Sequence, residues 1–149
     1  MGDLSARNAF AQYPEVDAGD AVSRTIIIVI ALKPGSAEIR PGTPFWEEMG
    51  AAGVKVEFLK NPCRLHLLDG WPQEIAEVEA MHCFGQWMQE KVSGEPVAGA
   101  IAISHLRALQ QARKSHGQAR LIIVIEEDCK PATNAVPHML TFIAAWFGN

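Results

Sequence analysis

The chain alternates uninterrupted apolar runs with segments in which apolar residues recur every three or four positions. Residues 24–32 and 121–125 are rich in Ile and Val, a composition typical of strands that are covered on both faces, as in a parallel sheet. Residues 54–59 and 64–68 alternate between apolar and polar side chains. These four segments are therefore predicted to be strands.

Helical signals separate the predicted strands. Thr43 is a favourable N-cap, Pro44 suits the first helical position, and Gly53 suits a helix end. Later segments show helical spacing of apolar residues. The predicted helices are a short one from Pro44 to about Gly53, one over about 75–88, one from about Ser104 to Gly117, and one over about 135–147.

Strands that alternate with helices predict a Rossmann-like α/β fold, with a mostly parallel sheet and helices on both faces. The 149 residues are enough for one domain with a substantial core. Residues 1–23 show no sustained period, so we expect an N-terminal tail or a loosely docked arm there. Residues 24–149 would then form the domain.

Charge and composition restrict the possible partners. A net charge of −4 and the absence of a Lys/Arg stripe argue against nucleic-acid binding. The longest strongly apolar run, Ile26–Leu32, is too short for a transmembrane segment, and the N-terminus lacks the features of a signal peptide. Three cysteines cannot all pair within one chain, which favours a reducing compartment. We therefore expect a cytoplasmic protein.

Three carboxylates follow the apolar strand at 121–125. Open parallel sheets bind ligands at the carboxyl ends of their strands, and oxygen ligands there suit Mg²⁺ or Mn²⁺. Alternation along the strand places Glu126 and Asp128 on one side and Glu127 on the other. Glu126 and Asp128 are therefore the predicted metal ligands. Alternatively, the three carboxylates form a solvated acidic loop with Lys130 as a partner.

Four short motifs occur in a fixed order along the chain. They are Val29-Ile30-Ala31-Leu32 at the end of the first strand, Asp69-Gly70 after a later strand, Ser104-His105-Leu106 at a helix start, and the strand that ends in Glu126-Glu127-Asp128. Together they resemble the family 25 glycosyltransferases, the lipopolysaccharide-type galactosyltransferase group. The resemblance covers about residues 24–147.

The chain departs from the family pattern in several places. Ala31 stands where the family usually has Asn, Ala100-Ile101 stand where Gly-Cys is common, and Glu127 replaces the middle Asp. The sequence also stops soon after the acidic motif, whereas family members continue into a second half that shapes the acceptor site. We therefore expect the N-terminal, donor-binding part of such an enzyme, or a degenerate relative.

The resemblance implies a GT-A-type domain that transfers a sugar such as galactose from a UDP-sugar to a saccharide or glycoconjugate acceptor. Mn²⁺ or Mg²⁺ would bridge the acidic motif to the diphosphate, and the pathway would be lipopolysaccharide biosynthesis. No residue is marked as the general base. The residues that would bind the donor are Val29, Ile30, Ala31, Leu32, Asp69, Gly70, Ser104 and His105.

For several of these residues, a purely structural role or a different function remains open. Ser104 could serve only as an N-cap, and Asp69-Gly70 could be an ordinary turn. The chain could bind a nucleotide sugar without turnover, or it could be a metal-dependent phosphohydrolase with Asp69 as a further ligand. A zinc site is disfavoured because His82 and Cys83 are adjacent on a predicted helix and would point apart.

Overall fold

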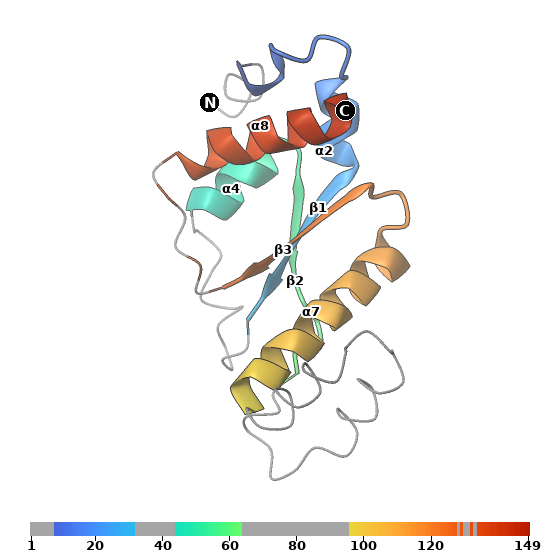
Figure 1. The fold of residues 1–149 in the computed structure, drawn as a ribbon, viewed down its shortest axis with the longest axis vertical. Coiled ribbons are helices and arrows are strands. Elements are labelled where there is room, and N and C mark those ends of the chain that lie inside the picture. The colour runs from blue at the N-terminus through green and yellow to red at the C-terminus, as the bar shows by residue number, and fades with distance from the viewer. Residues whose placement is uncertain (1–7, 32–43, 64–95, 128, 130–131, 133) are drawn as a thin grey trace.

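The computed structural model describes residues 8–31, 44–63, 96–127, 129, 132 and 134–149 (Figure 1). Three parallel strands form one sheet in the order β2-β1-β3. The strands are β1 (Thr25–Ile30), β2 (Lys55–Phe58) and β3 (Leu121–Glu126). The helices labelled in Figure 1 among these residues are α2 (Ala18–Ser23), α4 (Pro44–Ala51), α7 (Pro96–Ser115) and α8 (Ala135–Gly148). The predicted α/β class with a parallel sheet is therefore confirmed.

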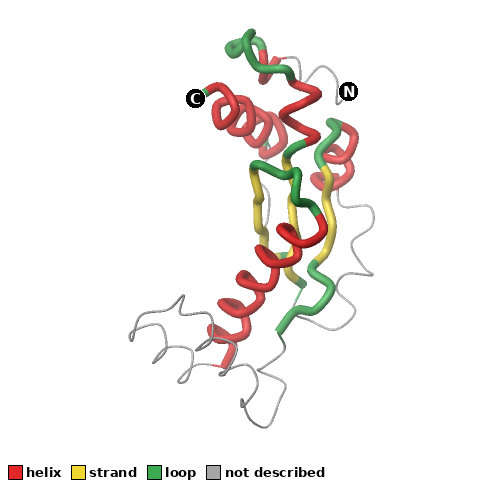
Figure 2. The backbone as a smooth tube through the Cα atoms, turned by 90° about the vertical axis from the view of Figure 1, so that its right-hand side faces the viewer, coloured by secondary structure: helices red, strands yellow, loops and turns green. Residues whose placement is uncertain are grey.

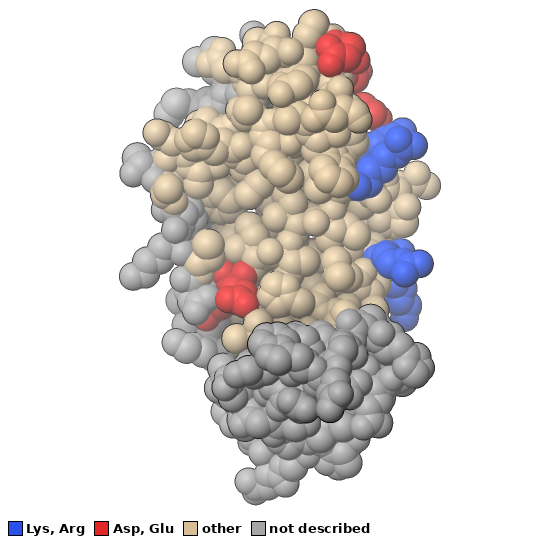
Figure 3. Space-filling model, in the orientation of Figure 1, with Lys and Arg blue, Asp and Glu red and all other residues tan. Residues whose placement is uncertain are grey.

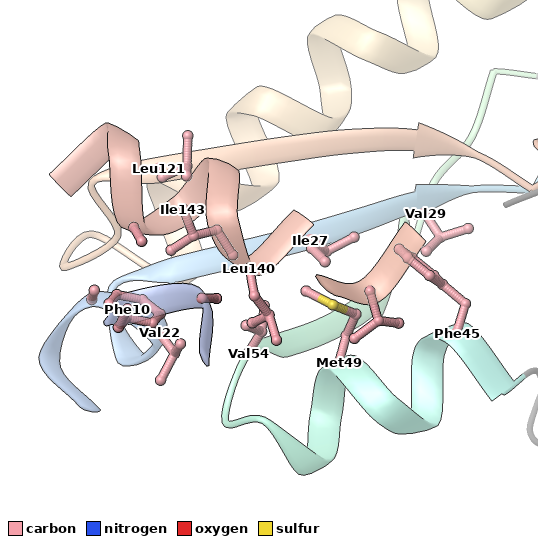
Figure 4. Packing of buried hydrophobic residues seen from close by; sticks show 14 residues of the cluster. Phe10, Val22, Ile27, Val29, Phe45, Met49, Val54, Leu121, Leu140 and Ile143 are labelled. Atoms are coloured by element: carbon pink, nitrogen blue, oxygen red, sulfur yellow. The ribbon is translucent and has the colours of Figure 1, made fainter. Parts of the chain in front are cut away.

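Helices cover both faces of the sheet, as predicted. On one face, Ile26, Ile28 and Ile30 pack with Ala108 and Ala112 of α7. The opposite face packs against α2, α4 and α8 (Figure 4). Every residue of β1 is buried because its neighbours cover it on both edges and both faces. This explains why the strand has an uninterrupted apolar sequence.

The helix predicted to begin at Pro44 is confirmed, and its end is set by Gly53. Gly53 has a φ of 96°, which an L side chain rarely adopts. Its N–H donates to the carbonyl of Gly50 (3.0 Å), and the N–H of Val54 donates to the carbonyl of Met49 (3.1 Å). These two bonds form a Schellman motif, with Met49 and Val54 both buried in the core.

Residues 8–23, which sequence periodicity assigns to a tail or loosely docked arm, belong to the packed unit. Phe10 and Val22 are buried in the same apolar cluster as the sheet. Asp17 caps α2 by accepting a hydrogen bond from the N–H of Asp20 (2.9 Å). The Thr25 hydroxyl donates to the carbonyl of Ala21 (2.9 Å), which fixes α2 against the start of β1. The sequence lacks a period here because α2 is only a short helix.

The helix predicted to open near Ser104 begins instead at Pro96. Proline suits a first helical position because its missing N–H would have no partner there. Ser104 is therefore in the helix interior and is not an N-cap. The predicted strand at 64–68 and the predicted helix at 75–88 lie outside the described residues. No helix in the part of the chain that the structure describes is long and apolar enough to cross a membrane.

Candidate functional site

The acidic end of β3 meets a histidine of α7 at the carboxyl edge of the sheet. Glu126 is the last residue of β3, and Nε2 of His105 lies 3.3 Å from its Oε1. Both side chains are 42% exposed, so the pair can still contact a ligand. A separation of 3.3 Å is slightly longer than an ideal hydrogen bond.

A pocket of about 510 Å³ lies beside this pair. Its volume is within the range of pockets that hold small molecules and cofactors. Phe45 and Trp46 of α4 and Met139 of α8 contribute apolar walls, and Cys129 contributes a thiol. The pocket is therefore mainly apolar, with His105 and Glu126 as its polar groups among the described lining residues.

An aromatic pair forms one wall of the pocket. The rings of Phe45 and Trp46 lie edge to face, with centroids 4.7 Å apart and an interplanar angle of 76°. The indole Nε1 of Trp46 is buried and has no hydrogen-bond partner among the described residues. A buried N–H without a partner is unfavourable, and this N–H is not exposed to the pocket.

The acidic motif separates as strand alternation predicts. Glu126 is half exposed and lines the pocket, whereas Glu127 is buried and does not line it. The backbone N–H of Glu127 donates to the carbonyl of Ile30 (2.8 Å), which continues the pairing with β1. Asp128, the second predicted metal ligand, lies outside the described residues.

Several predicted donor-binding residues have structural roles instead of lining the pocket. Val29 and Ile30 are fully buried on opposite faces of the sheet, and their carbonyls accept hydrogen bonds from Leu59 and Glu127. Ala31 is also buried. None of these three residues lines the pocket. Leu32, Asp69 and Gly70 lie outside the described residues.

Ser104 and His105 are adjacent on α7 but point to different surroundings. The Ser104 hydroxyl is buried and accepts a hydrogen bond from the backbone N–H of Cys63 (2.8 Å). It therefore anchors the segment after β2 to α7. His105 lines the pocket. Of the predicted site residues that the structure describes, only His105 and Glu126 come together at the pocket.

The aromatic wall and Cys129 were not singled out by the sequence motifs. Tryptophans beside predicted helices are expected to pack in the core, and Cys129 has no basic neighbour in sequence other than Lys130. One feature of the sequence could have predicted the position of the aromatic wall. In a parallel α/β sheet, the helix that follows a strand starts at the carboxyl edge, so the first turn of the helix at Pro44 is expected near the end of β3.

A second polar cluster ties α7 to β2. Gln111 Nε2 donates to Glu57 Oε1 (2.9 Å), and His116 Nε2 lies 3.0 Å from the same oxygen. Burial alone would raise the pKa of Glu57. The hydrogen bonds from Gln111 and His116, with the charges of His116 and Lys55, outweigh burial and hold that pKa below its ordinary value of 4.5. The cluster is structural, because none of its members lines the pocket.

Comparisons with known proteins do not assign a function to the chain, so the pocket is the basis for the assignment. No family model, no curated protein and no solved structure matches the chain. No three Cys, His, Asp or Glu side chains among the described residues are grouped so that they could hold a metal ion by themselves.

Proposed function

We propose that the pocket binds the diphosphate of a nucleotide sugar through a divalent cation, and that the chain acts as the donor-binding part of a GT-A-type glycosyltransferase. This proposal rests on the position of Glu126. Its half-exposed carboxylate stands at the carboxyl end of a parallel strand, in the wall of a pocket and beside an imidazole. Open parallel sheets bind nucleotides at this edge.

A carboxylate in the pocket wall is the kind of ligand that Mn²⁺ or Mg²⁺ takes from a protein. These cations commonly take one or two protein carboxylates and complete their shells with water and substrate phosphates. Glu126 supplies a carboxylate, and Asp128, two residues later, is the predicted second one. When bound, the cation would offset the charge that develops on a departing diphosphate.

Other residues of the pocket have definable roles in this proposal. His105 holds the Glu126 carboxylate in place or donates to a phosphate oxygen. The rings of Phe45 and Trp46 offer an apolar surface for the nucleoside. As the motifs predict, Leu32 and Asp69-Gly70 would complete the nucleotide site. A saccharide hydroxyl would be the acceptor.

Binding without sugar transfer is the second candidate, and one observation favours it. Glu126 is the only carboxylate among the described residues that line the pocket. A transferase also needs a group that accepts the proton of the acceptor hydroxyl or assists its attack. A phosphohydrolase would need still more acidic ligands around its metal, so we rank it third.

A thermal-shift titration with UDP and Mn²⁺ tests the proposal. A ligand at a hundred times its dissociation constant stabilises a folded protein by about 2.7 kcal/mol. We expect stabilisation that requires both UDP and Mn²⁺ and that is largely lost in Glu126→Gln. The matched control is Glu47→Gln, an exposed carboxylate in the first turn of α4.

Each outcome of the titration has a defined meaning. If the folded parent shows no shift with UDP and Mn²⁺, the nucleotide-site proposal is wrong. If Glu126→Gln keeps the full shift, the site lies elsewhere. If binding is present but no UDP-sugar is turned over with any saccharide acceptor, the binding-only relative is the correct interpretation.

A further inference from the structure

One flank of α8 continues the wall of the pocket. Ala135 and Met139 of this helix line the pocket. Phe142 and Trp146 follow Met139 at the spacing of side chains that share one flank of a helix. Met139, Phe142 and Trp146 together form a surface that we call the α8 stripe. The stripe therefore begins in the pocket and runs along the helix away from it.

The outer part of the α8 stripe is exposed. Phe142 and Trp146 are 51% and 53% exposed, although both are large and apolar. The side of α8 that enters the core is formed by other residues, among them Val136, Leu140 and Ile143. Contiguous exposed apolar surface beside a pocket is typical of a surface that binds a ligand or a partner.

The α8 stripe faces away from α4. Figure 4 shows Leu140 of α8 beside Val54 and Met49. Phe142 follows Leu140 by two residues and therefore points about 200° further around the helix. Figure 2 shows α8 on the β3 side of the sheet and α4 on the β2 side. Helix α4 therefore leaves the stripe uncovered.

No charged side chain of α8 interrupts the stripe. The helix contains no Asp, Glu, Lys or Arg, and the surface over α8 is almost free of charged side chains (Figure 3). The polar groups among the described lining residues of the pocket are His105 and Glu126. The pocket and the stripe thus form one continuous surface, with a polar group at its beginning and apolar side chains along its length.

A surface of this kind suits the two parts of an amphiphilic ligand. A base or a ribose carries hydrogen-bonding groups, and burying these against apolar side chains without partners is unfavourable. A hydrocarbon chain has no such groups, and each methylene group that it removes from water contributes favourably to binding. The α8 stripe therefore fits a hydrocarbon chain better than it fits a nucleoside.

We propose that the α8 stripe binds the hydrocarbon chain of an alkyl or isoprenoid phosphate, whose phosphate group lies in the pocket beside Glu126 and His105. A carboxylate repels a phosphate, so the phosphate would bind through the divalent cation on Glu126. This part of the inference rests on the proposed function, whereas the position of the chain rests on the stripe. Such a ligand would compete with a nucleotide diphosphate for the cation.

Calorimetric titration of the full chain with butyl phosphate and with octyl phosphate, in the presence of Mn²⁺, measures the contribution of the hydrocarbon chain. Both phosphates are used below the concentrations at which micelles form. We expect octyl phosphate to bind roughly tenfold more tightly, because its four additional methylene groups are partly buried on the stripe. In the double variant Phe142→Ser/Trp146→Ser, the two affinities should differ by about twofold at most.

Leu109→Ser is the matched control for the loss of an exposed apolar side chain. Leu109 is 42% exposed and belongs to α7, which packs on the opposite face of the sheet from α8. This variant should keep the roughly tenfold preference for octyl phosphate. Glu126→Gln should weaken the binding of both phosphates. Circular dichroism verifies that each variant is folded.

Equal affinities of the parent for the two phosphates would overturn the inference, and a shift with UDP and Mn²⁺ would then leave the proposed function intact. A preference that the double variant retains, or that Leu109→Ser removes, would place the chain elsewhere and would also overturn it. If neither phosphate binds to the folded parent, the phosphate site is wrong as well. Self-association that the double variant abolishes, without a preference for octyl phosphate, would identify a second copy as the occupant of the stripe.

An NMR titration of the ¹⁵N-labelled parent needs no substitution. Octyl phosphate should shift the amide signals of Phe142 and Trp146 and the indole signal of Trp146, whereas butyl phosphate should leave these signals in place. Signals of Phe142 and Trp146 that stay unchanged at saturating octyl phosphate would mean that the chain does not lie on the α8 stripe.

Discussion

At the scale of single residues, the Glu57 carboxylate shows how partly buried polar groups hold this fold together. Its Oε1 accepts a hydrogen bond from Gln111 of α7 and lies 3.0 Å from Nε2 of His116, the residue directly after α7, and its side chain is 22% exposed. Because its pKa is lowered in the folded chain, the stability it contributes is complete above about pH 4.5. That contribution is lost as the pH falls through the lowered pKa.

We therefore predict that Glu57→Gln reduces the free energy of unfolding at pH 7 by about 0.5–1.5 kcal/mol, the usual range for a hydrogen-bonded group. The difference from the parent should shrink as the pH falls below 4.5 and through the lowered pKa of Glu57. Urea unfolding at several pH values measures both effects. Glu48→Gln, an exposed change on α4, is the control. If Glu57→Gln retains the pH dependence of the parent, the assignment of the lowered pKa to Glu57 is incorrect.

At the scale of elements, the turn between α4 and β2 depends on the conformation of Gly53. A Cβ at Gly53 would lie 3.0 Å from Cγ2 of Val22, in addition to the strain of its positive φ. We predict that Gly53→Ala destabilises the fold by about 1–2 kcal/mol. A Cβ at Gly50, within the helix, would meet no atom within 4 Å, so Gly50→Ala should be neutral or stabilising by up to about 1 kcal/mol. Denaturant unfolding of the two variants measures this contrast, and equal effects would contradict it.

The elements also show what the sequence could predict. β1 and α4 were predictable because burial on both faces requires an apolar run, and because Pro44 and Gly53 mark the two ends of a helix. The start of α7 was not predictable. Ser104 is a favourable N-cap residue, but its hydroxyl instead accepts a hydrogen bond from the backbone N–H of Cys63. The position of Phe45 and Trp46 in the pocket wall depends on how α4 packs near α8. No local sequence pattern determines that packing.

At the scale of the whole molecule, helices from both faces of the sheet meet at the carboxyl end of β3. α7 contributes His105 to the pocket, and α4 and α8 contribute Trp46 and Met139 from the opposite face. We therefore expect changes in the packing of either helix layer to affect the pocket.

In the proposed function, Glu126 and His105 bring a divalent cation and a nucleotide diphosphate to the pocket. Its most direct test is the amide NMR spectrum of the ¹⁵N-labelled chain with UDP and substoichiometric Mn²⁺, because this paramagnetic ion broadens only nearby signals. We predict selective broadening of His105, Glu126 and Cys129, and much weaker broadening in Glu126→Gln. Broadening centred elsewhere, or none with saturating UDP, would contradict the proposed site.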